Sequence, residues 1–315
     1  MTLLTVSPKI ASLESRDEAE RRSRRLAIAL ICGCYALFAC LDTSAKWLGN
    51  QGVPVLAVVW ARYMGASVLA LAAANPLRAP QVLRSSRFWL QIGRALLLVG
   101  STLLNFFALR YLQLSETVSI AFAMPLLVAL LAGPLLGEWV GPRRLAAIGV
   151  GFAGVLLVVR PGAVGFHPAM LLVMLAVVFY ALYGISTRVL AKYDSAATTL
   201  VYSSLPAALL LTPALPWFWV WPQTGLQWAM LAATGLFASL GHWLLIKAHH
   251  HAPAAVLAPF VYGEILWMVA LGYLVFGDVP GLWTLAGGAV VIASGLYLWY
   301  RERAVQGARE LPAAA

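Results

Sequence analysis

The sequence predicts an all-α integral membrane protein with ten transmembrane helices, arranged as two inverted five-helix repeats. Hydrophobic residues make up 62% of the 315 residues, charged residues make up 11%, and the mean hydropathy is +0.83. This composition is typical of proteins that lie in lipid. Apolar segments of about 20 residues recur along the chain, which is the length a helix needs to cross a bilayer. Similarity between the two halves of the chain indicates an internal repeat.

The predicted spans are joined by short connections. They cover residues 26–48, 54–74, 88–109, 115–136, 144–160, 168–190, 196–215, 225–247, 253–276 and 281–300. Strands of an outer-membrane barrel would be shorter and would alternate in polarity. We therefore expect an N-terminal tail over residues 1–25, a first repeat over 26–160, a second repeat over 168–300 and a C-terminal tail over 301–315.

The net charge of +10 is distributed in a way that predicts topology. The basic residues are spread over short connections and form no basic, aromatic-lined groove, so we expect no nucleic-acid partner. With an internal N-terminus, nearly all of them fall on the cytoplasmic side, and only Arg110 and Arg160 border external loops. This bias predicts a multi-pass protein of the inner (plasma) membrane with both termini in the cytoplasm.

Two short patterns recur in the second half of the chain. The sequence YALF at 35–38 returns as YALY at 180–183, and LGE at 136–138 returns as FGD at 276–278. Because each repeat has five spans, an odd number, the second repeat enters the membrane in the opposite orientation. Inverted repeats are typical of secondary transporters, in which two related packings open one central site to either side of the membrane.

Further short segments extend this pattern over most of the chain. They are WARY at 60–63, ALRYL at 108–112 with Pro125, APA at 252–254 and APF at 258–260. With them the chain resembles the drug/metabolite transporter superfamily, specifically proteins with two EamA-type repeats. The resemblance implies ten helices, cytoplasmic termini and a central cavity built by both repeats. It leaves the substrate open, because similar proteins export amino acids or take up S-adenosylmethionine, riboflavin and other metabolites.

Ionisable residues within the spans are candidates for function, because a charge near a helix centre costs about 2.5–3.5 kcal/mol on insertion scales. Asp42 and Lys46 lie four residues apart on one face of the first span, where they can neutralise each other. Tyr35 shares that face. The face is either part of the cavity wall or the site of a structural ion pair near the external end.

Glu264 lies about midway along the ninth span, where similar proteins carry a neutral polar or apolar residue. Phe260 and Trp267 share its face at helical spacing. A carboxyl group at this depth is a candidate for binding a proton or a cationic substrate group. The alternative is a permanent ion pair with an arginine of the second or third span. We predict proton coupling through Glu264 or Asp42.

Polar and aromatic residues on other spans complete the predicted substrate site. Arg62 lies in the middle of the second span, as either a substrate contact or a structural tie, and Asn105 lies on a polar stripe of the third span. Tyr180 and Tyr183 on the sixth span and His242 on the eighth suit a planar or amphipathic solute, although ordinary packing also produces such stripes. The predicted substrate-binding set is Tyr35, Asp42, Lys46, Arg62, Asn105, Tyr180, Tyr183, His242, Phe260, Glu264 and Trp267.

These features predict a secondary transporter that moves a small organic metabolite across the inner membrane by alternating access. The solute classes considered are amino acids, nucleoside-like compounds, S-adenosylmethionine-like or riboflavin-like compounds, and drugs. No Gly-rich loop ending in Lys-Ser/Thr is present to supply energy from ATP. The alternative is an intramembrane enzyme acting on a lipid-like substrate, but the sequence has neither a His-Glu-x-x-His motif nor a nucleophile with a base.

The expected partners are the small-molecule substrate, membrane lipid and a coupling proton, with the protein a monomer or a homodimer. The run of histidines at 249–251 resembles a metal-binding tract, but no cysteine or carboxylate cluster accompanies it. We therefore expect no bound metal, no cofactor and no enzymatic activity.

Overall fold

The computed structural model describes residues 8–163, 165–252 and 254–310 of the chain, and every regular element within them is a helix. The elements are α1 (Pro8–Asn50), α2 (Val55–Ala74), η1 (Pro80–Leu83), α3 (Phe88–Leu109), α4 (Leu114–Ala121), α5 (Met124–Leu136), α6 (Pro142–Val159), α7 (Ala169–Leu190), α8 (Ala196–Leu211), η2 (Thr212–Ala214), α9 (Leu215–Phe218), α10 (Gly225–His251), α11 (Ala254–Leu257), η3 (Ala258–Gly263), α12 (Glu264–Leu271), η4 (Gly272–Phe276) and α13 (Leu282–Glu310).

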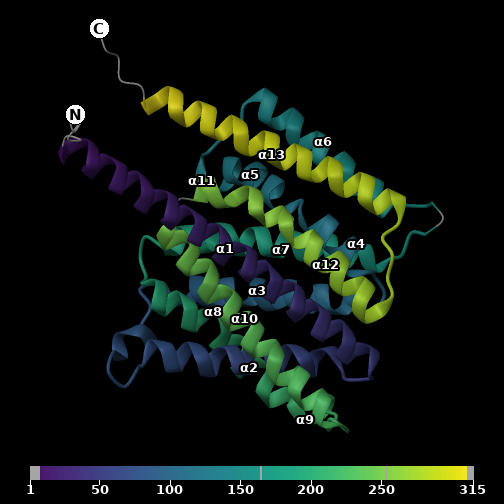
Figure 1. Cartoon of the computed structure of the whole chain (residues 1–315). Helices are drawn as coiled ribbons and strands as arrows, with labels where there is room; N and C mark the ends of the chain where they lie inside the picture. Colours follow the sequence, from purple (N-terminus) through teal and green to yellow (C-terminus); the bar gives the residue numbers. More distant parts are fainter. Residues whose placement is uncertain (1–7, 164, 253, 311–315) are drawn as a thin grey trace, which may run out of the picture.

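Ten helical stretches of the described chain are long and apolar enough to cross a membrane, which confirms the predicted number and order of spans. α1 and α13 continue beyond the predicted first and last spans, into the segments expected to be tails. Because ten is an even number, the start of α1 and the end of α13 lie on the same side of the bundle (Figure 1). We call this the terminal side, and the other the loop side.

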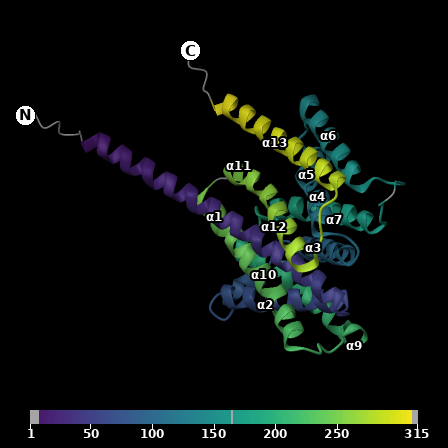
Figure 2. The same cartoon turned by 45° about the vertical axis from the view of Figure 1, so that its right-hand side comes forward.

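The two repeats pack against each other through corresponding helices. The first span, α1, packs along the eighth, α10, and in the matching pair the sixth span, α7, packs along the third, α3. The fifth and tenth spans, α6 and α13, also pack together, as do the second and seventh, α2 and α8. Figures 1 and 2 show α1 beside α10 and α6 beside α13. A pseudo-twofold axis in the membrane plane produces this exchange of equivalent partners.

Each repeat contains one interrupted span, which is the fourth span in the first repeat and the ninth span in the second. α4 ends at Ala121, and α5 begins at Met124 with Pro125 in its first turn. In the ninth span, the 3₁₀ helix η3 has Pro259 in its first turn and leads into α12 at Glu264. Proline lacks a backbone N–H, which is tolerated at the start of a helix but not in its interior. Each proline therefore begins a new helical segment within its span.

Both interrupted spans end in the same cap, at opposite sides of the bundle. Gly137 follows α5 with φ 76°, and Gly277 follows η4 with φ 71°, a left-handed conformation that glycine adopts without strain. The next backbone N–H, of Glu138 or of Asp278, donates to the carbonyl six residues earlier at 3.1 Å. The N–H of Gly137 donates to the Gly133 carbonyl and that of Gly277 to the Tyr273 carbonyl, both at 2.9 Å. This bond defines the αL cap of a helix. It positions one acidic residue directly after the helix on each side.

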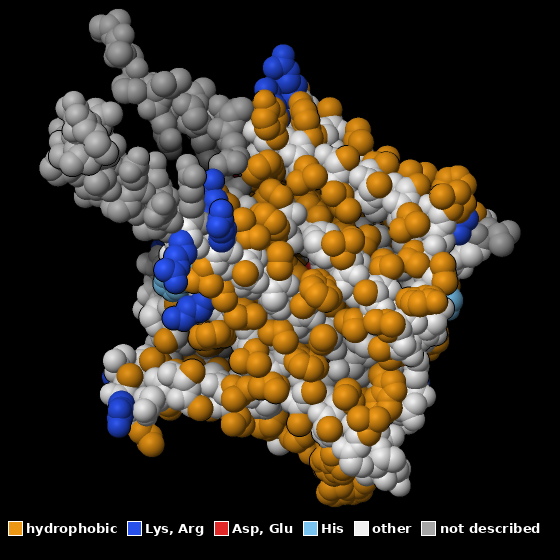
Figure 3. Space-filling view, in the orientation of Figure 1, with side chains coloured by type: hydrophobic (Ala, Val, Ile, Leu, Met, Phe, Trp, Pro, Cys, Tyr) orange, Lys and Arg blue, Asp and Glu red, His pale blue; other side chains and the backbone are white. Residues whose placement is uncertain are grey.

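The outer surface matches a protein that faces lipid. Apolar side chains cover most of the face shown in Figure 3, whereas most basic side chains in that view lie toward the terminal side. Large hydrophobic residues are exposed along most of the spans. In water such a surface would aggregate, and in a bilayer it needs no further partner.

Close helix contact between the repeats depends on two glycines. A Cβ atom added to Gly154 of α6 would lie 2.9 Å from the carbonyl oxygen of Gly287 in α13, and one added to Gly287 would lie 2.6 Å from the carbonyl oxygen of Gly154. Backbone atoms cannot move aside as a side chain can. Only glycine at both positions permits this approach, as is common where membrane helices pack closely.

We expect Gly154→Val to lower the stability of the folded protein by about 1–3 kcal/mol, because the added methyl groups push α6 and α13 apart. Gly149→Val is the matched control on the same helix, since no atom lies within 4 Å of its added Cβ. Thermal unfolding in detergent checks this. Equal melting temperatures for the two variants would contradict the close contact.

Candidate functional site

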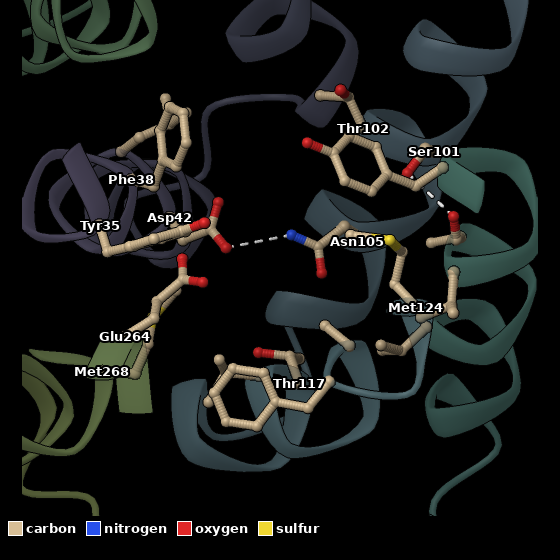
Figure 4. Close-up of a pocket in the computed structure, with 18 of the residues that line it drawn as sticks. Tyr35, Phe38, Asp42, Ser101, Thr102, Asn105, Thr117, Met124, Glu264 and Met268 are labelled. Carbon is tan, nitrogen blue, oxygen red and sulfur yellow. Dashed lines mark hydrogen bonds between the residues drawn. The ribbon is translucent and has the colours of Figure 1, made fainter. Parts of the chain in front are cut away.

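A cavity of about 230 Å³ lies between the repeats and receives side chains from both of them. We call it the central cavity. Its wall includes Tyr35, Phe38, Asp42, Arg62, Leu98, Ser101, Thr102, Asn105, Phe106, Thr117, Phe122, Met124, Pro125, Tyr180, His242, Val261, Glu264 and Met268. Figure 4 shows part of this wall. Because α1, α2, α3 and the fourth span face α7, α10 and α12 across it, the cavity belongs to neither repeat alone.

Two carboxyl groups from different repeats face each other in this cavity. Asp42 projects from α1 and Glu264 from the first turn of α12, and in Figure 4 the two carboxyl groups point toward one another. Asn105 donates its Nδ2 hydrogen to Asp42 Oδ2 at 3.2 Å. Two neighbouring negative charges repel strongly in a medium of low dielectric constant. The arrangement therefore suits a group that brings positive charge between them.

Arg62 contributes a positive charge to the same cavity. Its Nη1 donates to Thr102 Oγ1 at 2.7 Å, and its guanidinium group lies 5.3 Å from the ring centre of Tyr63 and 5.6 Å from that of Phe106. Within the described chain it forms no salt bridge, although it interacts electrostatically with Asp42 at longer range. The proposed tie to Glu264 is thus not an ion pair in this structure.

Aromatic rings form much of the remaining wall. Phe38 contacts His242 edge to face with ring centres 5.2 Å apart, and Phe122 of the fourth span also reaches the cavity. Tyr180 stacks on Tyr183 at 5.6 Å. Rings held by their neighbours in this way offer flat apolar surfaces to a bound molecule. The cavity thus combines a charged centre with aromatic sides.

The structure brings together most of the residues that the sequence singled out. Seven of the eleven predicted binding residues line the central cavity: Tyr35, Asp42, Arg62, Asn105, Tyr180, His242 and Glu264. Tyr183 lies behind Tyr180, where its ring packs 5.1 Å from the guanidinium group of Arg94. Tyr183 therefore supports the wall without forming it.

Phe260 and Trp267 lie outside the cavity, and the break in the ninth span accounts for the position of Phe260. In a 3₁₀ helix residues i and i+3 eclipse each other, so Val261 of η3 lies in line with Glu264 and Phe260 is rotated away. Phe260 packs with apolar residues of α1, and Trp267 is exposed on the outer surface. Val261, Glu264 and Met268 form the face that lines the cavity. For Phe260 the predicted stripe assumed an unbroken α-helix. Trp267 follows Glu264 within α12, and the packing of that helix turns Met268 to the cavity in its place.

Lys46 pairs with a different carboxylate from the one predicted. Its Nζ lies 2.6 Å from Asp278 Oδ2 and donates to the Leu112 carbonyl at 3.0 Å. The expected neutralisation of Asp42 by Lys46 is therefore wrong. Neighbours four residues apart on a helix can pair, but a partner from another repeat lies closer. Nothing in the local spacing could predict Asp278, which is 232 residues away.

Some cavity residues were not predicted. Phe38 lies four residues before Asp42 on α1, so helical spacing alone could have included it. Thr117 and Met124 come from the fourth span, and Met268 from the ninth. Met268 lies four residues after Glu264, so helical spacing could have included it too. Thr117 and Met124 lie on either side of the break in the fourth span, and their residue types give no signal of a site.

Two ion pairs between the repeats lie at opposite sides of the bundle. On the loop side Lys46 meets Asp278, with side chains only 9% and 23% exposed. On the terminal side Arg188 of α7 binds Glu138 through two hydrogen bonds of 2.8 Å, with side chains 61% and 49% exposed. Each acid follows an αL glycine cap, and each cation comes from the first helix of the other repeat. The two pairs are counterparts in the inverted repeat.

A larger cavity of about 1000 Å³ opens on the terminal side. Glu138 and Arg188 belong to its wall, and Met124, Pro125 and Val261 are shared with the central cavity. The central cavity therefore adjoins space on the terminal side. On the loop side, the buried pair of Lys46 and Asp278 lies about one helical turn beyond Asp42.

Comparison with known proteins identifies the family. Residues 25–160 and 167–300 each match the EamA-like transporter family. The chain is 31% identical to a riboflavin transporter of Vibrio cholerae over 264 residues, covering 82% of this chain and 87% of the relative. It is 28% identical to an S-adenosylmethionine uptake transporter of Rickettsia bellii over 262 residues, covering 83% and 89%.

A solved crystal structure with 20% sequence identity has the same fold, with a TM-score of 0.61 over 89% of this chain and 98% of the other. The family match covers both repeats, and the relatives align over most of their own length. Both repeats contribute to one cavity, as a shared site in a transporter requires. The chain belongs to the EamA-like transporter family and is a multi-pass membrane transporter of a small organic metabolite.

Proposed function

We propose that this protein is a proton-coupled secondary transporter of a planar heteroaromatic metabolite in the inner membrane, with both termini in the cytoplasm. The observation that carries the proposal is the pair of facing carboxyl groups, Asp42 and Glu264, inside an aromatic-walled cavity between the repeats. The pair suits a proton, and the rings suit a flat substrate. The membrane location and the coupling ion are part of this proposal.

The names of the relatives support the substrate class. Riboflavin and S-adenosylmethionine both combine a planar heteroaromatic ring system with a polar chain. Tyr35, Phe38 and Tyr180 can stack on such rings, and Asp42, Asn105 and Arg62 can hydrogen-bond to a polar chain. A cavity of about 230 Å³ is small for ligands of this size, since ligand sites usually span roughly 300–1,000 Å³. The adjoining terminal-side cavity supplies the remaining space.

The distribution of charge supports cytoplasmic termini. The connections on the terminal side carry most of the basic residues of the loops, including Arg78, Arg84, Arg87, Arg143, Arg144 and Lys192. The loop side carries Arg110 and Arg160. Positive residues are retained on the cytoplasmic side of membrane proteins, which makes the loop side external.

We further propose that the two inter-repeat ion pairs alternate as gates. Lys46–Asp278 closes the external side in this structure, and Glu138–Arg188 spans the rim of the cytoplasmic cavity in a more solvent-exposed position. Because the pairs are counterparts in an inverted repeat, rocking of one repeat on the other can loosen one as it tightens the other. Alternating access in inverted-repeat transporters follows this scheme.

The substrate class predicts which compounds stabilise the purified protein. We expect riboflavin or S-adenosylmethionine to raise the melting temperature, since a ligand at 100 times its Kd adds about 2.7 kcal/mol by mass action. Asp42→Asn should reduce the shift, and Trp267→Leu, on the outer face of α12, should leave it unchanged. If amino acids shift the melting temperature and no heteroaromatic compound does, this substrate class is wrong.

Proton coupling predicts a specific defect in Glu264→Gln. In reconstituted vesicles an imposed pH gradient should stimulate uptake by the unmodified protein several-fold. The glutamine variant should bind substrate and exchange it across the membrane but lose the stimulation, because an amide cannot bind and release the proton. Stimulation that survives in the variant would exclude Glu264 as the proton site, and no stimulation of the unmodified protein would exclude proton coupling.

The gate proposal predicts side-specific access to the cavity. In a background with Cys32, Cys34 and Cys40 replaced by serine, Thr117→Cys should react slowly with an impermeant thiol reagent added outside. Adding Lys46→Met should speed this reaction several-fold, because Asp278 loses its buried partner and the external side opens. Arg188→Met, at the cytoplasmic rim, is the matched control and should not speed it. Equal rates in all three proteins would contradict external gating by Lys46.

A further inference from the structure

A third cavity lies beside the central one, where α2 and α10 separate. The two helices touch at Gly65 and Gly235, since a Cβ added to Gly235 would lie 2.8 Å from Gly65 Cα. On the terminal side of this contact a lateral cavity of about 330 Å³ is lined by Arg62, Tyr63, Ala66, Leu69, Ala70, Ala73, Leu98, Leu200, Ser203, Ser204, Leu236, Ala238, Ser239, Leu240, His242, Trp243 and Ile246. Nearly all of its α2 and α10 residues follow the glycine contact, so the space is a wedge between diverging helices.

The outer rim of the lateral cavity faces lipid. Leu69 of α2 and Leu236, Leu240, Trp243 and Ile246 of α10 line it and are also exposed on the apolar surface of the bundle. The alanines of α2 leave room between these larger side chains. A molecule dissolved in the bilayer can therefore reach the cavity without passing through water.

The inner wall of the lateral cavity carries a positive charge, from Arg62. Arg62, His242 and Leu98 line both this cavity and the central one. Arg62 forms no salt bridge with any described residue. A guanidinium group at this depth is costly without an anion nearby, and Asp42 lies on the side of the central cavity. The lateral side of Arg62 thus faces a space where no carboxylate is among the lining residues.

Two serine hydroxyl groups in the wall of the lateral cavity also favour a bound ligand. Ser204 of α8 is only 5% exposed, and Ser239 of α10 also contributes to the wall. Neither Oγ has a hydrogen-bond partner among the described residues. A buried hydroxyl group without a hydrogen-bond partner destabilises the folded protein, and most buried hydroxyl groups in folded proteins have such a partner. A hydrogen-bond acceptor within the lateral cavity would satisfy them.

We propose that the lateral cavity binds a single-chain alkyl carboxylate that enters from the membrane. The carboxylate would meet Arg62 and the hydroxyl groups of Ser204 and Ser239, and the alkyl chain would lie along Ala66 and Ala70 toward the lipid. Arginine pairs with carboxylates through two parallel hydrogen bonds, and burial of each CH₂ contributes about 0.8 kcal/mol. Because Arg62 also lines the central cavity, an occupant here reaches the wall of the transport site.

The proposal for the lateral cavity does not depend on the identity of the transported substrate, and a binding experiment tests it. The probe is a twelve-carbon alkyl carboxylate with a photoreactive diazirine in its chain, added to the protein in phosphatidylcholine nanodiscs. We expect labelling of residues 66–73 of α2 and 236–246 of α10. Ala70→Phe, which fills the cavity, should reduce labelling several-fold. Val68→Phe, on the lipid-facing side of the same helix, is the matched control and should label normally.

A second comparison tests the charge. The alkyl alcohol of the same length and with the same diazirine should label these segments several-fold less than the carboxylate, and Arg62→Gln should abolish that difference. Ala73→Phe replaces Ala70→Phe if the latter does not give a monodisperse protein. Equal labelling of the Val68 and Ala70 variants would overturn the site. Equal labelling by acid and alcohol, or stronger labelling by a phosphatidylcholine carrying the diazirine, would overturn the carboxylate and indicate an ordinary lipid chain.

Discussion

Ionisable side chains are expensive inside a bilayer, and the arrangement of this protein follows from where it puts them. A charge near the middle of a span costs about 2.5–3.5 kcal/mol on insertion scales, and that cost falls when the group faces protein or a polar cavity. Asp42, Arg62 and Glu264 all point into the space between the repeats. Lys46 reaches Asp278 across the same boundary. The charged side chains of the spans therefore lie in the interior, where the repeats meet, and the outer face of the bundle is apolar.

Arg94 shows how completely the same cost can be met without a carboxylate. Its side chain is buried near the N-terminal end of α3. It donates hydrogen bonds to the Gln91 side chain, the hydroxyl groups of Thr187 and Ser203, and the carbonyl of Thr199. Since α3 lies in the first repeat and α7 and α8 in the second, this network joins the two halves. Arg94 therefore holds the two repeats together, whereas the side chain of Arg62 lines both the central and the lateral cavity.

The scaffold is symmetric, but the central site is not. Broken spans and αL glycine caps occur once in each half, and the two inter-repeat ion pairs are counterparts, as an inverted repeat requires. By the same alignment, however, Asp42 corresponds to Thr187, which bonds to Arg94, and Glu264 corresponds to Met124. Both acids are therefore unique to their own repeat. In the proposed mechanism, selection of a substrate or ion depends on this difference, and the paired elements govern the motion that exposes the site.

The sequence by itself determined the class, the number of spans and the repeat, because each rests on a local property. Span length follows from bilayer thickness, and the paired acid after each Gly cap follows from a short recurring pattern. Both can be read without knowing what packs against what. The candidate site was also largely predictable, since mid-span charges such as Asp42, Arg62 and Glu264 have few places to go except a cavity.

Only the tertiary structure decided which face of each span meets the cavity and which charges pair. The 3₁₀ turn before Glu264 places Val261 at the cavity in place of Phe260, because it adds about 20° of rotation per residue relative to an α-helix. After Glu264, the packing of α12 turns Met268 to the cavity and Trp267 to the outer surface. Lys46 forms its ion pair with Asp278 and not with Asp42, because packing of the two repeats brings Asp278 closer than the neighbour on the same helix. Backbone phase and contacts between distant segments are set by packing of the entire bundle, and no local pattern encodes them.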